Sequence, residues 1–157
     1  NKATLIQMAR MRAAQFELDP ELVCAVIEQE SNWNAWATRF EPAFEKKYVE
    51  PLKQNGELKT FGASMETEAN ARATSYGLMQ VMGQVAREQG VAIPFLTELC
   101  DPDRGLETGC AHLAKHARDK QGRRVSFEKL LLAWNGGGDP GYPNKVLERV
   151  SHYLPRA

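Results

Sequence analysis

The sequence has 157 residues, 43% hydrophobic and 25% charged, which indicates one globular domain over residues 1–157 rather than a disordered chain. Twenty basic and twenty acidic side chains give a formal net charge of zero. That balance disfavours a nucleic-acid binder, whose surface is broadly positive. No apolar run reaches the roughly 18 residues needed to span a bilayer. The chain starts at Asn1 without a methionine or an export signal, so we expect a removed leader or a trimmed chain.

The pattern of apolar residues predicts a mainly α fold. A first helix should end near Leu18, because Asp19 is a good N-cap and Pro20 suits the first helical position. A second helix should run from about Pro20 to Asn32. Further helices are expected over residues 80–90, 101–122, 127–135 (capped by Ser126) and 143–153.

The segment from Trp36 to Ser75 is the least regular part of the chain, because prolines and glycines divide its charged, partly helical turns. The best strand signal in it is a short extended piece at residues 59–61. A loop region of about forty residues in a compact domain is more often functional or partly helical than structureless.

The cysteine and histidine patterns give no metal-site signature. Cys100 and Cys110 lie ten residues apart, which is compatible either with a disulfide or with two separate buried thiols. Cys24 is expected to be a small buried hydrophobe. His112 and His116 lack the intervening glutamate of a zinc protease motif, so we expect no metal or other cofactor and a solvated pair of imidazoles.

Glu30 is the candidate catalytic residue. It continues the helical face formed by residues 22, 23, 26 and 27, whereas Glu28 is expected to point into solvent. Burial disfavours a charged carboxylate and raises its pKa, which suits a general acid. A shift of about two pKa units corresponds to about 2.7 kcal/mol. The alternative is a structural glutamate at the edge of the core, paired with an arginine or capping a helix.

Two further stretches of the sequence, taken together with Glu30-Ser31, indicate a specific family. Residues 73–82 read ATSYGLMQVM, and residues 130–138 read LLLAWNGGG. Glu30-Ser31, Gly77-Leu78-Met79-Gln80 and Ala133-Trp134-Asn135-Gly136-Gly137, in this order, resemble the signature of the soluble lytic transglycosylases, a goose-type-lysozyme-like family that cleaves bacterial peptidoglycan. Trp134 and Gly137 depart from the usual Tyr and Ala, in a form similar to phage-type and specialised members. The interval from Glu30 to Gly77 is longer than in compact members, so residues 37–73 look like an insertion beside the cleft.

The resemblance implies a lysozyme-like fold of six to eight helices around a substrate groove, and one catalytic carboxylate. Glu30 would protonate the bond between N-acetylmuramic acid and N-acetylglucosamine. It would then accept the proton of the muramic acid C6 hydroxyl as that oxygen attacks C1 and forms a 1,6-anhydro ring. Such an intramolecular attack needs no activated water. The implied partner is the peptidoglycan glycan strand, outside the cytoplasm, acted on by a monomer.

The resemblance also implies roles for six substrate-side residues. Ser31 positions the acid or the sugar, or alternatively only ends its helix. Gln80 hydrogen-bonds an acetamido or hydroxyl group, and Met79 packs beneath a sugar ring. Tyr142, and more weakly Tyr76, are expected to hydrogen-bond Glu30. Asn135 is expected to cap its helix and steady the glycine loop.

Two nearby side chains have plainer interpretations. Trp134 is expected to line the core rather than to stack on a sugar, because it follows three leucines. Glu41 is expected to pair with Arg39 or another basic neighbour rather than to act as a second acid.

Three other functions remain open from the sequence. A hydrolytic lysozyme on the same fold would differ only in using water instead of the C6 hydroxyl. A non-catalytic wall-binding module would tolerate loss of Glu30. A helix-turn-helix DNA binder is disfavoured by the zero net charge.

Overall fold

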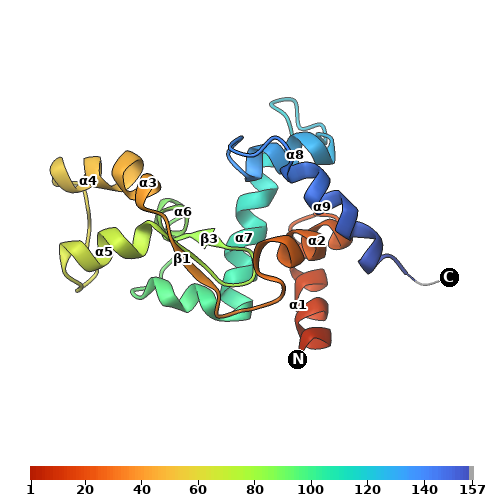
Figure 1. Ribbon diagram of the computed structural model, residues 1–157, viewed down its shortest axis with the longest axis horizontal. Coiled ribbons are helices and arrows are strands. Elements are labelled where there is room, and N and C mark those ends of the chain that lie inside the picture. Colours follow the sequence, from red (N-terminus) through yellow and green to blue (C-terminus); the bar gives the residue numbers. More distant parts are fainter. Residues whose placement is uncertain (156–157) are drawn as a thin grey trace. The chain divides into compact units, whose positions relative to one another are not determined.

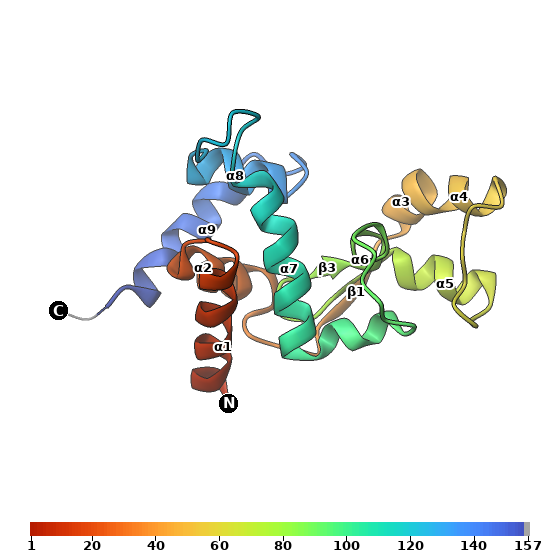
Figure 2. The same ribbon diagram turned by 180° about the vertical axis from the view of Figure 1, so that it is seen from behind.

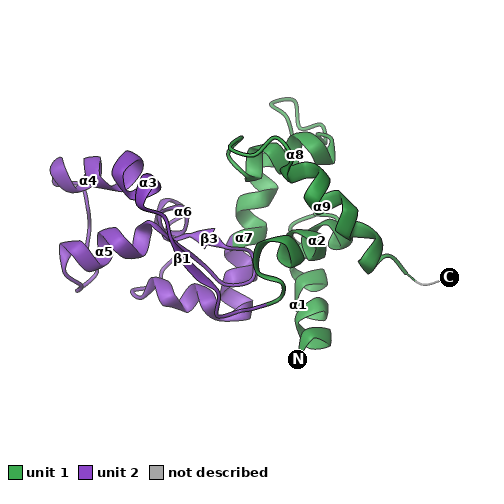
Figure 3. Ribbon diagram, in the orientation of Figure 1, with its two compact units in different colours: residues 1–33, 109–157 green, residues 34–108 purple. Residues whose placement is uncertain are grey.

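The structure is a computed structural model that describes residues 1–155. Its chain groups into two compact units, shown in different colours in Figure 3. Unit 1 contains Asn1–Trp33 and the chain from Gly109 onward, and unit 2 contains Asn34–Thr108. The expectation of one catalytic domain over 1–157, with residues 37–73 as an insertion, stays a prediction.

Unit 1 is helical. It contains α1 (Lys2–Gln15), α2 (Pro20–Ser31), the end of α7 (Pro102–His116), α8 (Phe127–Trp134), α9 (Tyr142–Val150) and the 3-10 helix η3 (Ser151–Tyr153). Helix α2 packs against α1 and α9 (Figure 1). Six consecutive residues of α2, Leu22 to Ile27, are buried, so the helix is enclosed on all sides along this stretch.

The predicted capping residues define two of these helices. Asp19 Oδ1 accepts a hydrogen bond from the Leu22 amide at 2.8 Å and Pro20 follows, which confirms the start of α2. Ser126 Oγ accepts from the Lys129 amide at 3.2 Å, which confirms the start of α8. Helix α1 ends at Gln15, short of the predicted Leu18, because Glu17 adopts a left-handed conformation (φ 56°) that ends the helix.

Unit 2 combines short helices with a three-stranded antiparallel sheet of order β1-β2-β3. Its elements are β1 (Thr38–Phe40), α3 (Pro42–Phe44), the π-helix η1 (Glu45–Val49), α4 (Glu50–Gln54), α5 (Met65–Arg72), β2 (Thr74–Tyr76), β3 (Val81–Met82), α6 (Gly83–Glu88) and η2 (Leu96–Cys100). Seen from behind in Figure 2, the segment from α3 to α4 lies beside α5, and α4 and η1 both contact it. The region predicted to be irregular and partly helical is therefore largely helical.

The predicted strand at residues 59–61 is wrong. Phe61 is left-handed (φ 48°), and the Lys59 carbonyl accepts from Arg72 Nη2 at 2.8 Å, so this segment is bound by a side chain instead of a neighbouring strand. The real strands pair Thr38 with Tyr76 and Ser75 with Met82.

Three helix boundaries also differ from the expectation. The helix predicted to begin at residue 80 begins at Gly83, because residues 81 and 82 form β3. Helix α7 ends at His116 rather than Gly122, because Asp119 accepts from the amides of Gln121 and Arg123 and closes a turn. Helix α9 stops at Val150 and continues as η3.

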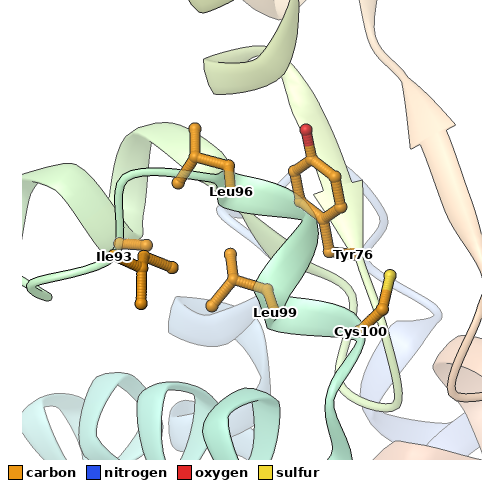
Figure 4. Close-up of a cluster of buried hydrophobic side chains, with 6 residues drawn as sticks. Tyr76, Ile93, Leu96, Leu99 and Cys100 are labelled. Carbon is orange, nitrogen blue, oxygen red and sulfur yellow. The ribbon is translucent and has the colours of Figure 1, made fainter. Parts of the chain in front are cut away.

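A cluster of buried side chains holds the sheet end of unit 2 (Figure 4): Tyr76, Ala86, Ile93, Leu96, Leu99 and Cys100. Gly77 belongs to this contact. It has φ 74°, and a Cβ there would lie 2.5 Å from the Leu99 carbonyl oxygen, so only glycine fits without displacing backbone. The glycine of the Gly-Leu-Met-Gln stretch is thus explained by packing.

The described residues include all three cysteines, and each is a buried thiol, so of the two possibilities for Cys100 and Cys110 the structure has separate thiols. Burial raises the pKa of Cys24 to about 11 and that of Cys110 to about 12, and it also raises the pKa of Cys100.

The predominance of helix with one small sheet confirms the predicted mainly α, lysozyme-like fold class. Among the described residues, no helix is long and apolar enough to cross a membrane.

Candidate active site

Glu30 lies in the last turn of α2, directly after the enclosed stretch of that helix. The helix ends sharply because Asn32 (φ 48°) and Trp33 (φ 65°) are both left-handed. Trp33 is then 7% exposed, and its Nε1 donates to the Tyr153 hydroxyl at 2.7 Å. The chain leaving α2 is therefore fixed by a buried anchor three residues after Glu30, which holds the last turn in place.

Two neutral donors bind one oxygen of the half-buried Glu30 carboxylate. The Tyr142 hydroxyl donates to Oε1 at 2.5 Å, and Trp134 Nε1 donates to the same oxygen at 3.3 Å. The Tyr142 bond is the one expected from the sequence. Both donors come from segments more than a hundred residues from Glu30 in the chain. A carboxylate bound in this way is oriented by tertiary structure rather than by its own helix.

The glycine loop between α8 and α9 positions Tyr142. Gly136 and Gly137 both have positive φ, and the Gly137 amide donates to the Leu132 carbonyl, closing the end of α8. Asn135 Nδ2 donates across the loop to the Asp139 carbonyl at 3.4 Å. Asp139 in turn accepts from the Gly141 amide at 2.9 Å. Asn135 thus caps the helix and steadies the loop, as predicted, and Tyr142 begins α9 at a defined point.

The hydroxyl of Tyr142 stays protonated throughout the physiological range. Burial and, next, the charge of Glu30 raise the pKa of Tyr142 far above its ordinary value. Tyr142 is therefore a permanent donor to Glu30. Hydrogen bonds to the charged form of a carboxylate oppose the effect of burial, because they stabilise the anion.

Glu28 does not point into solvent, so that prediction is wrong. Its side chain is 19% exposed, accepts a hydrogen bond from the Tyr153 hydroxyl, and lies 3.2 Å from His152 Nδ1 and 3.9 Å from Arg149 Nε. Burial acts to raise the pKa of Glu28, but the hydrogen bonds from Tyr153 and His152 leave it below the ordinary value. The physical reason for the error is that α9 and η3 cover the side of α2 that periodicity assigned to water.

The remaining predicted residues of unit 1 have mixed outcomes. Ser31 Oγ donates to the Ile27 carbonyl at 3.2 Å, the helix-ending arrangement named as its alternative. Trp134 is half-buried and does more than line the core, because its indole N–H binds Glu30. His112 is not simply solvated: its ring lies 5.5 Å from that of Trp134 and 5.2 Å from that of His116.

Gln80 holds the backbone of unit 2. Its Nε2 donates to the carbonyls of Ala37 (3.0 Å) and Gly77 (2.9 Å), and its Oε1 accepts from Ser75 Oγ at 2.9 Å. The Ala37 carbonyl also accepts from the Gly77 amide at 2.8 Å. Both amide hydrogens are used within the protein, so a hydrogen bond to a sugar would have to use the second lone pair of Oε1.

Met79 and Tyr76 are buried in unit 2. Met79 is 1% exposed, so contact with a sugar ring stays a prediction that requires its side chain to be uncovered. Tyr76 is 4% exposed, and its hydroxyl donates its one hydrogen to the Ala71 carbonyl at 3.0 Å. Tyr76 thus belongs to a hydrophobic core of unit 2, and the weaker expectation that it hydrogen-bonds Glu30 stays a prediction.

Unit 2 also contains a buried ion-pair network that sequence reasoning missed. Glu68 Oε1 lies 2.8 Å from Arg72 Nε and 2.8 Å from Arg87 Nε, and all three side chains are less than 10% exposed. The i, i+4 spacing of Glu68 and Arg72 was an available signal. Arg39 pairs with Glu41, as expected. The described residues contain no group of three or more His, Cys, Asp or Glu side chains arranged to hold a metal ion.

The comparisons with known proteins agree with the resemblance seen in the sequence. The family described as the transglycosylase SLT domain matches residues 7–146, which is most of the chain. Comparison with curated proteins and comparison with solved structures returned no match. Since the matched range contains Glu30, the glycine motif and the Trp134–Tyr142 segment, the chain belongs to the transglycosylase SLT domain family.

Proposed function

We propose that this protein is a peptidoglycan lytic transglycosylase that cleaves the β-1,4 bond between N-acetylmuramic acid and N-acetylglucosamine, with Glu30 as its single acid and base. Membership of the SLT family supports the substrate class. The observation that carries the assignment to Glu30 is that two neutral donors, Tyr142 and Trp134, converge on one oxygen of its half-buried carboxylate.

In the first step, the Glu30 carboxyl group gives its proton to the glycosidic oxygen as the bond from that oxygen to C1 breaks. The bonding electrons leave with the oxygen, and the carbonyl oxygen of the neighbouring N-acetyl group bonds to C1. In the second step, the C6 hydroxyl oxygen attacks C1, displaces the acetamido oxygen and loses its proton to the Glu30 carboxylate. The enzyme ends as it began, and no water is consumed.

Tyr142 and Trp134 act on the state between the two steps, when Glu30 is an anion. A hydrogen bond to a charged group contributes about 1.5–3 kcal/mol, more than one to a neutral group. Both donors therefore strengthen as Glu30 releases its proton, and they lower the barrier instead of only binding the ground state. The persistent protonation of Tyr142 keeps this donor available.

The same contacts set a limit on the acid. Partial burial favours the protonated carboxyl group, whereas the two donors favour the carboxylate. A general acid works best when its pKa lies near the working pH. The proposal therefore requires that bound substrate excludes water from Glu30 and so favours its protonated form before proton transfer.

Substrate contacts form the second part of the proposal. Ser31, one residue after the acid, accepts a hydrogen bond from a sugar hydroxyl, and the Oε1 atom of Gln80 accepts one from an acetamido N–H. Asn135 acts indirectly, by holding the loop that precedes Tyr142. The glycan strand places the activity outside the cytoplasm, at the cell wall, and the protein acts as a monomer.

Digestion of purified peptidoglycan, followed by mass spectrometry of the muropeptides, tests the proposal. The expected products end in 1,6-anhydromuramic acid and are lighter by one water than the reducing ends of a hydrolase. Hydrolytic ends from the wild-type protein would identify it as a lysozyme on the same fold. Cleavage at the wild-type rate by a folded Glu30→Gln variant would show that Glu30 is not the acid.

A further inference from the structure

A pocket of about 260 Å³ opens in unit 2, apart from the elements that carry Glu30 in the sequence. Its lining comes from residues 57–61, from the end of α5 and from α6: Glu57, Lys59, Phe61, Arg72, Gln84, Arg87 and Glu88. The volume suits a ligand of the size of one amino acid. Nothing in the transglycosylase reaction described above uses these residues.

The buried floor and the exposed rim of this pocket carry net charges of opposite sign. Its floor carries the guanidinium groups of Arg72 and Arg87, whose side chains are 8% and 5% exposed, with Glu68 behind them as the shared counter-ion. Two buried cations and one buried anion leave the floor with one excess positive charge. The rim carries the solvent-exposed Glu57, Lys59 and Glu88, with one excess negative charge.

The buried floor favours an anion. Uncompensated charge in a poorly solvated site is costly, and an incoming carboxylate would remove that cost. Each guanidinium group has five N–H donors. Within the described residues, Arg72 uses three of them, on Glu68, Gln84 and the Lys59 carbonyl. Arg87 uses four, on both oxygens of Glu68 and on the carbonyls of Ile93 and Pro94. Arg72 thus supplies two donors for a ligand and Arg87 supplies one.

Phe61 gives the pocket an apolar wall. Phe61 as a residue is 53% exposed although its backbone is held in a left-handed conformation, and the Arg87 guanidinium carbon lies 4.0 Å from the ring centroid. A non-glycine residue with positive φ persists only where its surroundings hold it there. The contact with Arg87 supplies one such restraint, and it leaves the outer face of the ring open to an aliphatic chain.

We propose that this pocket binds the zwitterionic amino-acid end of a peptide. The carboxylate lies on Arg72 and Arg87, the ammonium group lies between Glu57 and Glu88 at the rim, and the intervening carbons lie on Phe61. Resting on the proposed function, we assign this peptide to the stem that peptidoglycan carries on its muramic acid. The pocket then makes the enzyme prefer strands with intact stems.

The binding test uses the full chain and isothermal titration calorimetry. The probe is the stem tripeptide ending in meso-diaminopimelate, whose terminal carbon carries both an ammonium group and a carboxylate. We expect a dissociation constant of about 1 mM or below. Amidation of that carboxylate or acetylation of that amine should each weaken binding at least tenfold. Free D-alanine binding as tightly as the tripeptide would overturn the assignment to a peptide end.

Rim variants keep the test independent of folding. Phe61→Ala and the double variant Glu57→Gln/Glu88→Gln alter exposed side chains, and each should weaken the tripeptide at least tenfold. The matched control is Tyr48→Ala, because Tyr48 is a similarly exposed aromatic (48%) with its own cation, Lys47, 4.8 Å from the ring, and does not line the pocket. Wild-type affinity in both the Phe61 variant and the double glutamate variant overturns the proposal. So does the absence of any binding to the wild-type protein at a tripeptide concentration of about 10 mM, which is the weakest affinity of interest.

The experiments distinguish a wrong assignment of the pocket from a wrong assignment of the enzymatic activity. Glu30→Gln should bind the tripeptide as the wild type does. A wild-type protein that binds the tripeptide but cleaves no peptidoglycan would support the pocket assignment and contradict the proposed enzymatic activity. Conversely, Phe61→Ala should cleave peptide-stripped glycan at the wild-type rate and lose only the preference for strands that carry stems. An unchanged preference in that variant would overturn the assignment to the stem.

Discussion

Two carboxylates, one in each unit, are removed from bulk water in opposite ways. In unit 1, Glu30 is bound by the neutral hydroxyl of Tyr142 and the neutral indole of Trp134. In unit 2, Glu68 is bound by two guanidinium groups at 2.8 Å. Glu68 is needed as an anion, because it neutralises cations that hold α5 to α6 and to the chain beyond it. The hydrogen bonds from Tyr142 and Trp134, as contacts with neutral donors, impose no such requirement on Glu30.

This difference distinguishes a structural carboxylate, Glu68, from the proposed catalytic one, Glu30. A carboxylate that takes and returns a proton must be tolerable in both states, and neutral donors permit that more readily than fixed cations do. Changes near Glu30 should therefore alter activity more than stability, and changes near Glu68 should alter stability first.

The largest effect is expected for Glu30→Gln. Loss of general acid and base catalysis should reduce the rate of peptidoglycan cleavage about 10³-fold. The amide still accepts from Tyr142, so the midpoint of thermal unfolding should stay within a few degrees of the wild type. Turbidity loss of cell-wall suspensions and circular dichroism measure the two quantities. A large drop in the unfolding midpoint would place Glu30 with the scaffold.

Glu68→Gln should have the opposite profile. Removing the shared counter-ion leaves two buried guanidinium groups without compensation, at a cost of about 3 kcal/mol in the free energy of unfolding. Urea titration followed by circular dichroism measures this. Glu66→Gln is the matched control, since it removes a carboxylate from the same helix whose side chain is 76% exposed. Equal stability of the two variants would contradict a structural role for Glu68.

Gly77→Ala should destabilise unit 2 by about 2 kcal/mol. The added Cβ would meet the Leu99 carbonyl oxygen at 2.5 Å, and the backbone at φ 74° is unfavourable for alanine. Gly90→Ala isolates the second cause, because Gly90 has φ 71° and a Cβ added there would meet no atom within 4 Å. The difference in urea midpoint between the two variants reports the steric contact alone.

Tyr142→Phe should have a smaller effect, and on activity. Losing one hydrogen bond to the Glu30 anion, worth about 1.5 kcal/mol, corresponds to about tenfold in rate and about one unit in pKa. The lost bond stabilised the charged form, so the pKa of Glu30 rises. The alkaline limb of the profile of kcat/KM against pH should move upward by about one unit. An unmoved limb would mean that Tyr142 does not act on Glu30.

The smallest effect concerns Glu28, which is intermediate because it contacts both the neutral Tyr153 and the basic side chains of Arg149 and His152. Its pKa is lowered in the folded state, so its stabilising contribution is complete above its ordinary unfolded value and is lost as pH falls through the folded value. Stability curves from pH 7 to pH 3 for the wild type and Glu28→Gln should converge at the acid end. Parallel curves would contradict this.

Local signals predicted much of unit 1. Asp19-Pro20 and Ser126 defined helix starts because capping is decided within four residues. The repeat along α2 placed Glu30 on the buried face, the resemblance of three motifs then made it the catalytic candidate, and the glycine run predicted the turn before Tyr142. The same periodicity misplaced Glu28, because no pattern within α2 reports that α9 and η3 would cover it.

Unit 2 was predicted less well, for a different reason. Its strands have only two or three residues, too few to show a periodicity, and β1 pairs with β2 across more than thirty residues, as Thr38 does with Tyr76. Gln80 was expected to bind sugar because its motif suggested so, while its hydrogen bonds to Ala37 and Gly77 depend on the folded sheet. The contact of Arg87 with Glu68, nineteen residues away, likewise had no local signal.

The three buried cysteines make the chain convenient for chemical labelling. Thiolate is the form that reacts with maleimides, and the raised pKa values of Cys24 (about 11) and Cys110 (about 12), like that of Cys100, keep it scarce near neutral pH. A single cysteine added at an exposed position, such as Trp36, would then carry a fluorophore or spin label selectively in the otherwise native sequence. Because Trp36 is 79% exposed and lies two residues before β1, such a label would report on motion at the start of that strand during glycan binding, with the natural thiols left in place.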